Sequence, residues 1–409
     1  MSKLNYNNKK LYMLLMIVLA VICFLRYYTG DTDSYNTTIL ALNYTIGFTS
    51  RGLIGTVFLG LDKITPFSIM NATGARMFLL GSTVVFFIIV FLFIAMIIKR
   101  CEEKHLAKIE LLLMFLVIAL ATTFSDSGNF GRVDMYMIAI SLVSVMLIVW
   151  QKCEWLIILL TAIAVMIHQG YVFMYYNIVL VLLLVKIISD KSKRIKYIII
   201  FALSLIICSV LFLYLELFSH ASNGAEIYDS VAALASSLAS DGEFHKTLLA
   251  HELLGVDLSG VEHEFHMKNL AEIILLSVFL LPYIIMFFKV MVRTFKKVES
   301  GADKFMYLAV YAGSLTMLPD YLIKVDYGRW VMSTVAYYVV VFAVMYIWDE
   351  RFKTVLVSYL DEVKQRYSFY PLLILYPVLF VPFLDVNIDS ITAIIGHVAN
   401  REILHWWTF

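Results

Sequence analysis

The sequence has little charge and few residues that would break helices. Charged residues make up 15% of its 409 positions, and there are only 6 prolines and 4 cysteines. Hydrophobic residues make up 61%, which is more than a soluble chain can bury in one or two cores. The composition therefore excludes a soluble globular protein and indicates that lipid surrounds most of the chain.

The chain also lacks an overall charge of one sign. Its formal net charge is +1, so no basic field would attract nucleic acid. Cys23 and Cys208 lie inside apolar runs, and Cys101 and Cys153 lie beside basic loops, a placement that does not favour a disulfide framework. The first apolar stretch has no small-residue cleavage site after it, so we expect a retained first helix.

Apolar runs close to the roughly 20 residues needed to cross a bilayer recur along the whole chain. They predict an all-α, polytopic transmembrane bundle of about eleven helices, forming a single integral membrane domain over residues 1–409. The predicted spans are 11–28, 77–98, 109–124, 135–151, 154–167, 171–188, 197–218, 272–292, 305–322, 331–348 and 371–385.

Lysine and arginine are distributed unevenly between alternate loops. One set of loops, which includes the N-terminal segment, contains 22 of the 32 basic residues. The positive-inside rule predicts that this set is cytoplasmic and that the N-terminus is cytoplasmic. The outer segments are then 29–76, 125–134, 219–271, 319–330 and 386–409, with short interfacial helices expected near 52–61, 231–238 and 247–254.

An arginine next to a glycine recurs where the predicted outer loops meet helices. A helix N-terminus presents unpaired N–H groups and a partial positive charge, and the planar guanidinium group matches phosphate oxygens. Two such ends in one place would make a diphosphate clamp. Alternatively, the arginines pair with loop carboxylates. The arginines are Arg51, Arg132 and Arg329, and the carboxylates are Asp126, Asp134 and Asp326.

Acidic residues follow the first predicted helix. Asp31 and Asp33 could act as a general base on a sugar hydroxyl or hold a divalent cation, or they could be solvated residues or a helix cap. A second group, Asp320, Lys324 and Asp326, has the same ambiguity between substrate binding and mutual ion pairing.

His168 ends an apolar helix and precedes an aromatic run that begins at Tyr171. An ionisable residue at the end of a membrane span is a functional candidate, and aromatic faces suit sugar rings. A structural hydrogen bond is the alternative role for this histidine.

The largest outer loop is rich in histidine and glutamate, and three or four such side chains could hold zinc. The spacing is not the His-Glu-x-x-His of a metalloprotease, so we assign no metal ligand and interpret the loop as a polar lid over an outer cavity. The residues concerned are His245, His251, Glu252, Glu262, His263, Glu264 and His266.

The segment from Arg132 to His168 places an arginine at the outer start of a helix, then a short basic turn, a second helix, and a histidine followed by aromatic residues. In this respect it resembles the EpsG/Wzy-like polymerases of bacterial surface polysaccharides. Acidic residues after the first helix and arginines on the outer face also look like multi-span glycosyltransferases of the GT-C type. The loop 219–271 does not align with a specific polymerase loop.

This resemblance implies a multi-pass protein of the bacterial cytoplasmic membrane that acts in capsule, O-antigen or exopolysaccharide synthesis. Its substrate would be a polyprenyl-diphosphate-linked glycan, and its partners would include membrane lipid and other envelope polysaccharide assembly proteins. Arg132 and Arg329 would hold the diphosphate, and His168 would line the reaction centre.

The chemistry of such a substrate requires three kinds of surface, and the sequence supplies each of them at the expected depth in the membrane. An apolar tail needs a lateral groove between helices, a diphosphate needs cations, and a sugar needs polar and aromatic walls. We expect Arg51, Arg132 and Arg329 to stabilise the leaving diphosphate, with Asp31, Asp33 or His168 as the base.

Two other functions remain open. A transporter or lipid-linked-glycan flippase would need charges near the membrane midplane, and the predicted helix centres carry almost none. A membrane acyltransferase would need a cytoplasmic histidine. His105 is the candidate there, and we expect it in a charged, solvated turn.

Overall fold

The computed structural model describes residues 2–126, 128–218, 223–256, 271, 274–278, 280–318 and 327–366. Every regular element in this part of the chain is a helix, which confirms the predicted all-α bundle. Six described helices are long and apolar enough to cross a membrane: α1 (Ser2–Tyr27), α4 (Ala72–Arg100), α5 (Leu106–Thr123), α6 (Val133–Trp150), α10 (Arg194–Phe218) and α18 (Tyr327–Trp348).

The remaining predicted spans correspond to shorter helices. These are α7 (Leu156–Ile167), α8 (Tyr171–Met174), α9 (Tyr176–Ser189), α15 (Leu281–Lys296), α16 (Gly301–Ala312) and the 3-10 turn η2 (Gly313–Met317). The predicted span 171–188 is interrupted at Tyr175, whose carbonyl accepts a hydrogen bond from Ser141 Oγ at 3.1 Å. The span 371–385 and the tail 386–409 lie outside the described residues.

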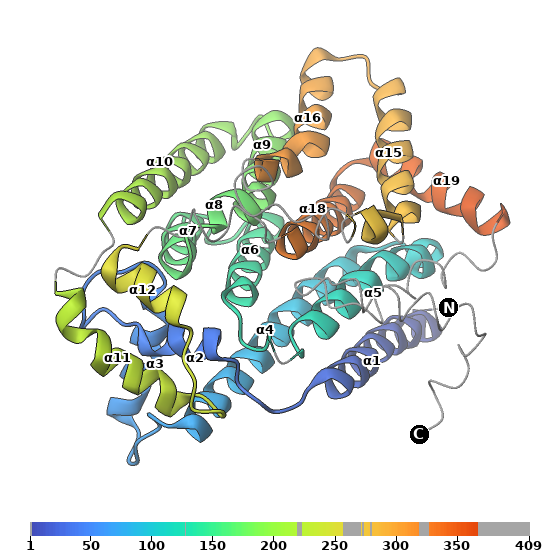
Figure 1. Ribbon diagram of the computed structural model, residues 1–409. Coiled ribbons are helices and arrows are strands. Elements are labelled where there is room, and N and C mark those ends of the chain that lie inside the picture. Colours follow the sequence, from blue (N-terminus) through green and yellow to red (C-terminus); the bar gives the residue numbers. More distant parts are fainter. Residues whose placement is uncertain are drawn as a thin grey trace.

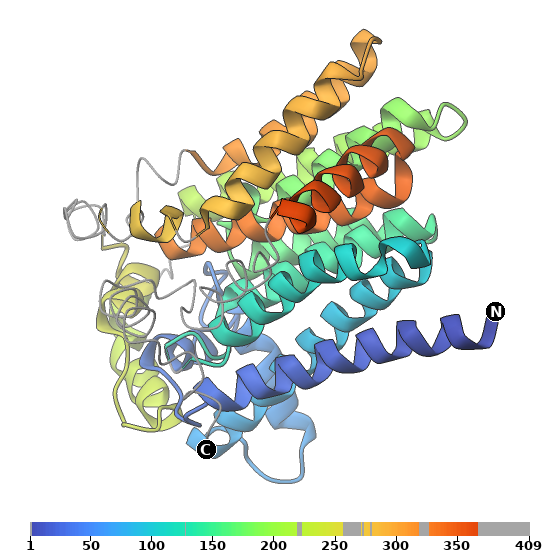
Figure 2. The same ribbon diagram turned by 90° about the vertical axis from the view of Figure 1, so that its right-hand side faces the viewer.

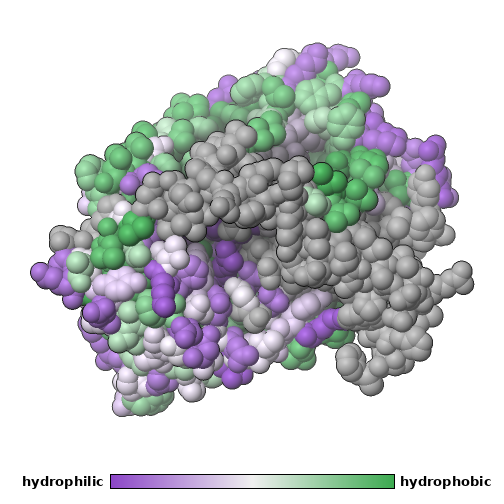
Figure 3. Space-filling model, viewed as in Figure 1, coloured by the Kyte–Doolittle hydropathy of each residue, from purple (hydrophilic) through white to green (hydrophobic). Residues whose placement is uncertain are grey.

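The long helices differ in what surrounds them. Helices α5, α6 and α18 are largely buried, whereas α1 and α10 lie at the edge of the bundle with large apolar side chains such as Leu25 and Leu217 exposed. Exposed leucine, valine and phenylalanine side chains along a helix of this length are suited to hydrocarbon rather than water. In Figure 3, hydrophobic residues accordingly lie along the α10 side of the molecule.

Short helices gather at one end of the bundle, which we call the short-helix end. Figures 1 and 2 show four of them together there: α2 (Ser34–Ala41), α3 (Gly52–Ile64), α11 (Gly224–Leu238) and α12 (Lys246–Leu254). Short interfacial helices were expected near 52–61, 231–238 and 247–254, and the structure confirms a helix at each place; their position at a membrane interface stays a prediction. Hydrophilic residues are frequent on the surface of this end in Figure 3.

The opposite end, which we call the basic end, contains the 3-10 turn η1 (Glu103–His105) and the amphipathic helix α19 (Glu350–Arg366). Lys9 at the start of the chain donates to the carbonyl of Cys101 at 2.9 Å, and Arg293 pairs with Glu362 at 2.6 Å. Where the structure describes them, the loops of the two predicted sets lie at opposite ends of the bundle (Figure 2). Which end faces the cytoplasm stays a prediction.

Candidate functional site

The three predicted arginines all lie at helix N-termini. Arg51 is the N-cap residue of α3, Arg132 is the N-cap residue of α6, and Arg329 lies in the first turn of α18. Before Arg132, Gly131 has a φ of +80°, a left-handed conformation that glycine adopts without strain. Local sequence thus places each guanidinium group beside the positive end of a helix.

Asp134 joins two of these arginines. Arg329 Nε lies 3.1 Å from both carboxylate oxygens of Asp134, and Arg132 Nε lies 3.6 Å from Oδ2. Tyr175 donates a hydrogen bond to Oδ1 at 3.4 Å. The Asp134 side chain is 0% exposed and lies in the first turn of α6. The predicted pairing of arginine with Asp134 is therefore present, and it brings Arg132 and Arg329 together.

Arg51 reaches the same region with an unusual backbone conformation. Its φ is +62°, in the left-handed region that residues other than glycine rarely adopt. Such a conformation costs on the order of 1–3 kcal/mol and persists where the surroundings impose it. Here the guanidinium group pairs with the buried carboxylate of Glu252 on α12 and lies 3.3 Å from His168 Nε2.

Tyr35 on α2 lies between the arginines and a histidine. The Arg132 guanidinium carbon is 5.1 Å from the centre of the Tyr35 ring, and the His245 ring meets Tyr35 edge-on at 5.5 Å. Burial alone lowers the pKa of Arg51, but interactions with Tyr35 and with the Glu252 carboxylate raise it above its ordinary value, against the opposing charge of Arg329. Arg132 and Arg329 share Asp134, and Arg329 acts electrostatically on Arg51. We call Arg51, Arg132 and Arg329 the arginine cluster.

Asp33 and His245 are two titratable groups beside this cluster that influence each other electrostatically. Asp33 caps α2 by accepting from Tyr35 N at 3.0 Å, which is the helix-cap role left open by the sequence. Burial raises the pKa of the Asp33 carboxyl, although His245 and Arg132 oppose the shift. Burial lowers the pKa of His245, and Arg132 and Arg51 add to this effect while Asp33 opposes it. The two groups thus lie within electrostatic range of each other.

His168 makes two contacts through its ring nitrogens. Its Nδ1 accepts from Gly170 N at 2.8 Å, so the neutral ring carries its proton on Nε2. Arg51 Nη2, 3.3 Å from that Nε2, can only donate. Arg51 and His168 are thus in direct contact at this end of the bundle.

The other predicted site residues lie in different surroundings. Asp31 is exposed, and its backbone amide donates to Thr29 Oγ1 at 3.3 Å. Asp126 accepts from Asn129 Nδ2 at 3.4 Å in the loop before α6, and Asn129 in turn accepts from Arg132. The Tyr171 side chain is fully buried and accepts from Ser141 Oγ at 3.4 Å, so it packs inside the bundle. Asp320, Lys324 and Asp326 lie outside the described residues.

Three contributors to the arginine cluster were not assigned to it from sequence. Tyr35 has no local signal, and His245 and Glu252 were considered only as possible zinc ligands. The sequence did contain a signal for Glu252, which is a carboxylate within a short, largely apolar helix. Its side chain is 2% exposed, and a carboxylate buried to that degree needs a cationic partner. Helix α12 supplies that carboxylate, and Thr38 Oγ1 holds the start of α12 by accepting from His245 N at 2.9 Å.

The described residues contain no group of three or more histidine, cysteine, aspartate or glutamate side chains that could hold a metal ion. Glu262, His263, Glu264 and His266 lie outside them. A divalent cation therefore has no described protein site, and its part in the chemistry stays a prediction.

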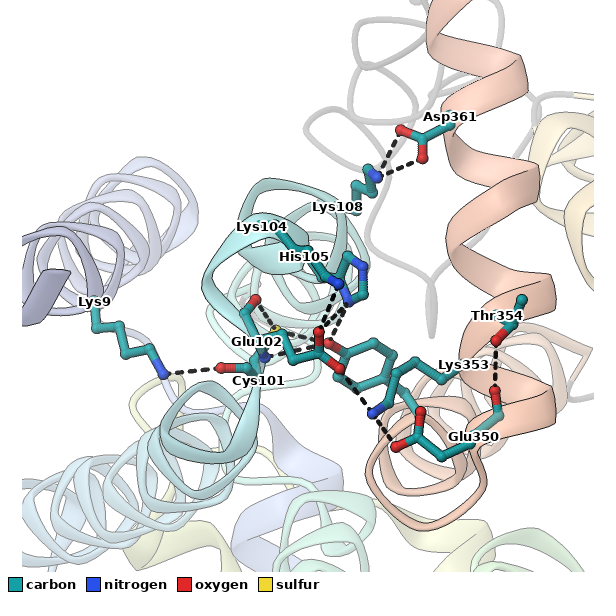
Figure 4. Close-up of polar contacts among 11 residues, drawn as sticks. Lys9, Cys101, Glu102, Lys104, His105, Lys108, Glu350, Lys353, Thr354 and Asp361 are labelled. Atoms are coloured by element: carbon teal, nitrogen blue, oxygen red, sulfur yellow. Dashed lines mark hydrogen bonds and ion pairs between the residues drawn. The ribbon is translucent and has the colours of Figure 1, made fainter.

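The basic end carries a second polar cluster (Figure 4). Lys353 on α19 pairs with Glu102 at 2.9 Å and with Glu350, and Lys108 pairs with Asp361 at 2.6 Å. His105 is only 9% exposed, and its Nδ1 lies 3.0 Å from Tyr346 Oη. The prediction that His105 lies in a solvated turn is therefore wrong. The cause is the packing of η1 against α18 and α19. These contacts attach α19 to the α4–α5 turn.

No protein-family model matches the chain, and no curated protein or solved structure matches it either. Chemical inference therefore rests on the arrangement of the residues. Three guanidinium groups, two helix N-termini that bear arginine caps, and the His168 ring meet at the end of a membrane-spanning bundle. Such an arrangement can bind an anion with several oxygens, and Asp33 can accept a proton beside it.

Proposed function

We propose that this protein transfers or polymerises sugars from a polyprenyl-diphosphate-linked donor. The site would face the extracytoplasmic side of a bacterial cytoplasmic membrane, and the product would be capsule, O-antigen or exopolysaccharide. The observation that carries the proposal is the meeting of Arg51, Arg132 and Arg329. They come from three distant segments, and the side chains are 12%, 18% and 11% exposed.

These partly buried guanidinium groups suit a diphosphate leaving group. Arginine binds phosphate oxygens through paired N–H groups, and partial burial strengthens each charge-assisted hydrogen bond. Asp134 and Glu252 hold the fork of Arg329 and Arg51 in a fixed orientation before substrate arrives. Preorganised donors of this kind stabilise charge that develops in the transition state.

The reaction needs a base as well as cations. The acceptor hydroxyl oxygen forms a bond to the anomeric carbon of the donor sugar, while the bond from that carbon to the diphosphate oxygen breaks. The diphosphate leaves with the electron pair, and the hydroxyl proton passes to Asp33. Burial raises the pKa of Asp33, which makes its carboxylate a stronger base than an exposed aspartate.

The distribution of charge supports transfer over transport. Across the described parts of α4, α6, α7 and α10, ionisable aspartate, glutamate, lysine and arginine side chains lie near the helix ends. Transport of an ion or a charged headgroup across the bilayer favours such groups near the midplane. The polar chemistry of this chain instead concentrates at the two ends of the bundle.

The test replaces each arginine of the cluster by lysine, which keeps the charge but removes the planar fork. Arg76→Lys serves as a matched control, because Arg76 is an exposed arginine at the same end that donates to Tyr28 Oη at 3.1 Å. We expect Arg132→Lys and Arg329→Lys to shorten the surface glycan and to accumulate lipid-linked precursor, with about a 10²-fold loss of transfer rate. Arg76→Lys should leave both unchanged.

Unchanged glycan length in the Arg132 and Arg329 variants, at normal protein levels, would overturn the proposal. Accumulation of precursor on the cytoplasmic leaflet rather than the outer leaflet would instead support a flippase. The leaflet is read by adding a membrane-impermeant enzyme that modifies the glycan to intact and to opened cells.

A further inference from the structure

A groove runs between α4 and α6 on the lipid-facing side of the bundle. Its volume is about 570 Å³, within the range of roughly 300–1,000 Å³ found for ligand sites. Along α4 its wall is formed by residues three to five positions apart, which share one face of a helix. These wall residues are Met77, Phe78, Gly81, Ser82, Val85, Phe86 and Ile89.

Two small residues on facing helices account for the gap. Gly81 on α4 and Ala139 on α6 both line the groove, so little side-chain volume fills the space where these helices pack. A Cβ atom added at Gly81 would meet no other atom within 4 Å. The groove also opens toward lipid, because Met77 and Val85 on its wall are 61% and 56% exposed.

One end of the groove adjoins the arginine cluster. Met135 on α6 lines the groove and directly follows Asp134, which holds Arg132 and Arg329. Ile167 on α7 also lines it and directly precedes His168, which contacts Arg51. On two separate helices, the lining of the apolar groove thus comes within one residue of a side chain that contacts the arginine cluster.

We propose that this groove binds the isoprenoid tail of a lipid-linked substrate whose diphosphate lies at the arginine cluster. The inference rests on the proposed function for the diphosphate, but the tail site is tested separately. A branched hydrocarbon chain fits the apolar wall, and the adjoining guanidinium groups match the anionic headgroup. The arrangement also allows the lipid to enter sideways from the membrane without leaving hydrocarbon.

A second groove, of about 400 Å³, lies between α15, α16 and α18. It is less suited to a hydrocarbon tail, because hydroxyl groups line much of its wall. These belong to Ser277, Tyr283, Tyr311, Ser314, Thr334 and Tyr338. The α4–α6 groove has only Ser82 and Tyr136 as hydroxyl-bearing wall residues.

The experiment uses farnesyl diphosphate with a photoreactive diazirine at the far end of its tail, bound to the purified full chain. Peptide mapping should place the cross-links on α4 and α6, near Val85, Ile89 and Ile140. Gly81→Leu, which fills the groove, should reduce this labelling about tenfold. Gly60→Leu is the matched control, since Gly60 is also an exposed helical glycine with open space around it and does not line the groove.

Cross-links on α15 and α18 in place of α4 and α6 would overturn the inference, as would equal labelling by a phosphatidylglycerol carrying the same diazirine on its acyl chain. A farnesol probe separates the two proposals. Labelling of the groove by farnesol as efficiently as by the diphosphate would uphold the tail site and count against diphosphate recognition by the arginine cluster.

Discussion

Arg329 and Asp134 are 195 residues apart in the chain, yet Arg329 Nε lies 3.1 Å from each oxygen of the fully buried Asp134 carboxylate. The ion pair ties the first turn of α18 to the first turn of α6. It thereby places two guanidinium groups, those of Arg132 and Arg329, on one carboxylate. This relationship determines how the candidate site should respond to substitution.

Removal of the Arg329 guanidinium group should destabilise the fold through Asp134. Breaking a buried pair typically costs about 3–5 kcal/mol, and we expect the lower end for Arg329→Met because Arg132 Nε still lies 3.6 Å from Asp134. Adding Asp134→Asn should recover most of the loss, since the fully buried carboxylate charge is then removed and Arg132 keeps its hydrogen bond to Asn129. Thermal unfolding of the purified variants in detergent measures this. Strictly additive effects of the two substitutions would show that the pair is not coupled.

Arg51 offers a separation of stability from function. Arg51→Gly relieves a left-handed conformation that costs a residue with a Cβ roughly 1–2 kcal/mol, but it leaves Glu252 buried without that cation. The double variant Arg51→Gly with Glu252→Gln removes both problems. We expect it to unfold at or above the wild-type temperature while glycan transfer is lost. Retained transfer in this double variant would remove Arg51 from the site.

The lowered pKa of His245 predicts acid sensitivity of α12. His245 Nδ1 caps α12 by accepting from Leu248 N at 3.1 Å, which a protonated ring cannot do. The pKa of His245 is lower when α12 is docked than when α12 is released, so protonation of His245 favours release. Docking of α12 should therefore be complete above the ordinary histidine pKa of about 6.5 and be lost as the pH falls below it. Hydrogen exchange of the α12 amides between pH 5 and 8 reports this.

His245→Asn provides the control for that experiment, since asparagine caps a helix but does not titrate in this range. The variant should show flat protection of α12. Asp33 has the opposite effect on docking, because its pKa is raised in the folded protein. Its protonated form at low pH favours docking, and this contribution is lost as the pH rises and the carboxyl ionises. Equal pH dependence in wild type and variant would assign the effect to another group.

The basic end should be dispensable for transfer. His105→Gln removes the contact with Tyr346 at a cost of about 1 kcal/mol in stability, but His105 belongs to η1 at the basic end, away from the arginine cluster. We expect unchanged glycan length. A loss of activity with intact protein would favour the acyltransferase alternative, in which this histidine takes part in chemistry.

Much of this arrangement could be predicted from sequence because the signals are local. Apolar runs located the long helices, and the arginine–glycine steps located helix N-termini at Gly52, Val133 and Tyr327. The contact between Arg51 and Glu252 could not be predicted, since it joins residues 201 apart: apolar periodicity predicted a helix over 247–254, but no local pattern says what that helix packs against. Tyr171 shows the same limit: its place in an aromatic run does not reveal that its hydroxyl meets Ser141 on α6.

Cys153 allows a direct test of orientation. It is the exposed one of the four cysteines, and Cys23, Cys101 and Cys208 are buried. A membrane-impermeant maleimide should label it only after cells are opened. In a Cys153→Ser background, Glu243→Cys in the exposed loop between α11 and α12 should be labelled in intact cells. The reverse pattern would place the arginine cluster in the cytoplasm and contradict transfer on the outer face.

The central claim is that Arg51, Arg132 and Arg329 form one diphosphate site, and a binding measurement tests it most directly. Titration of the purified chain with farnesyl diphosphate and with farnesol should show stronger binding of the diphosphate by about 10²-fold. In the Arg132→Lys, Arg329→Lys double variant this preference should fall to a few-fold, while Arg76→Lys keeps it. Equal preference for the diphosphate in wild type and double variant would contradict the account.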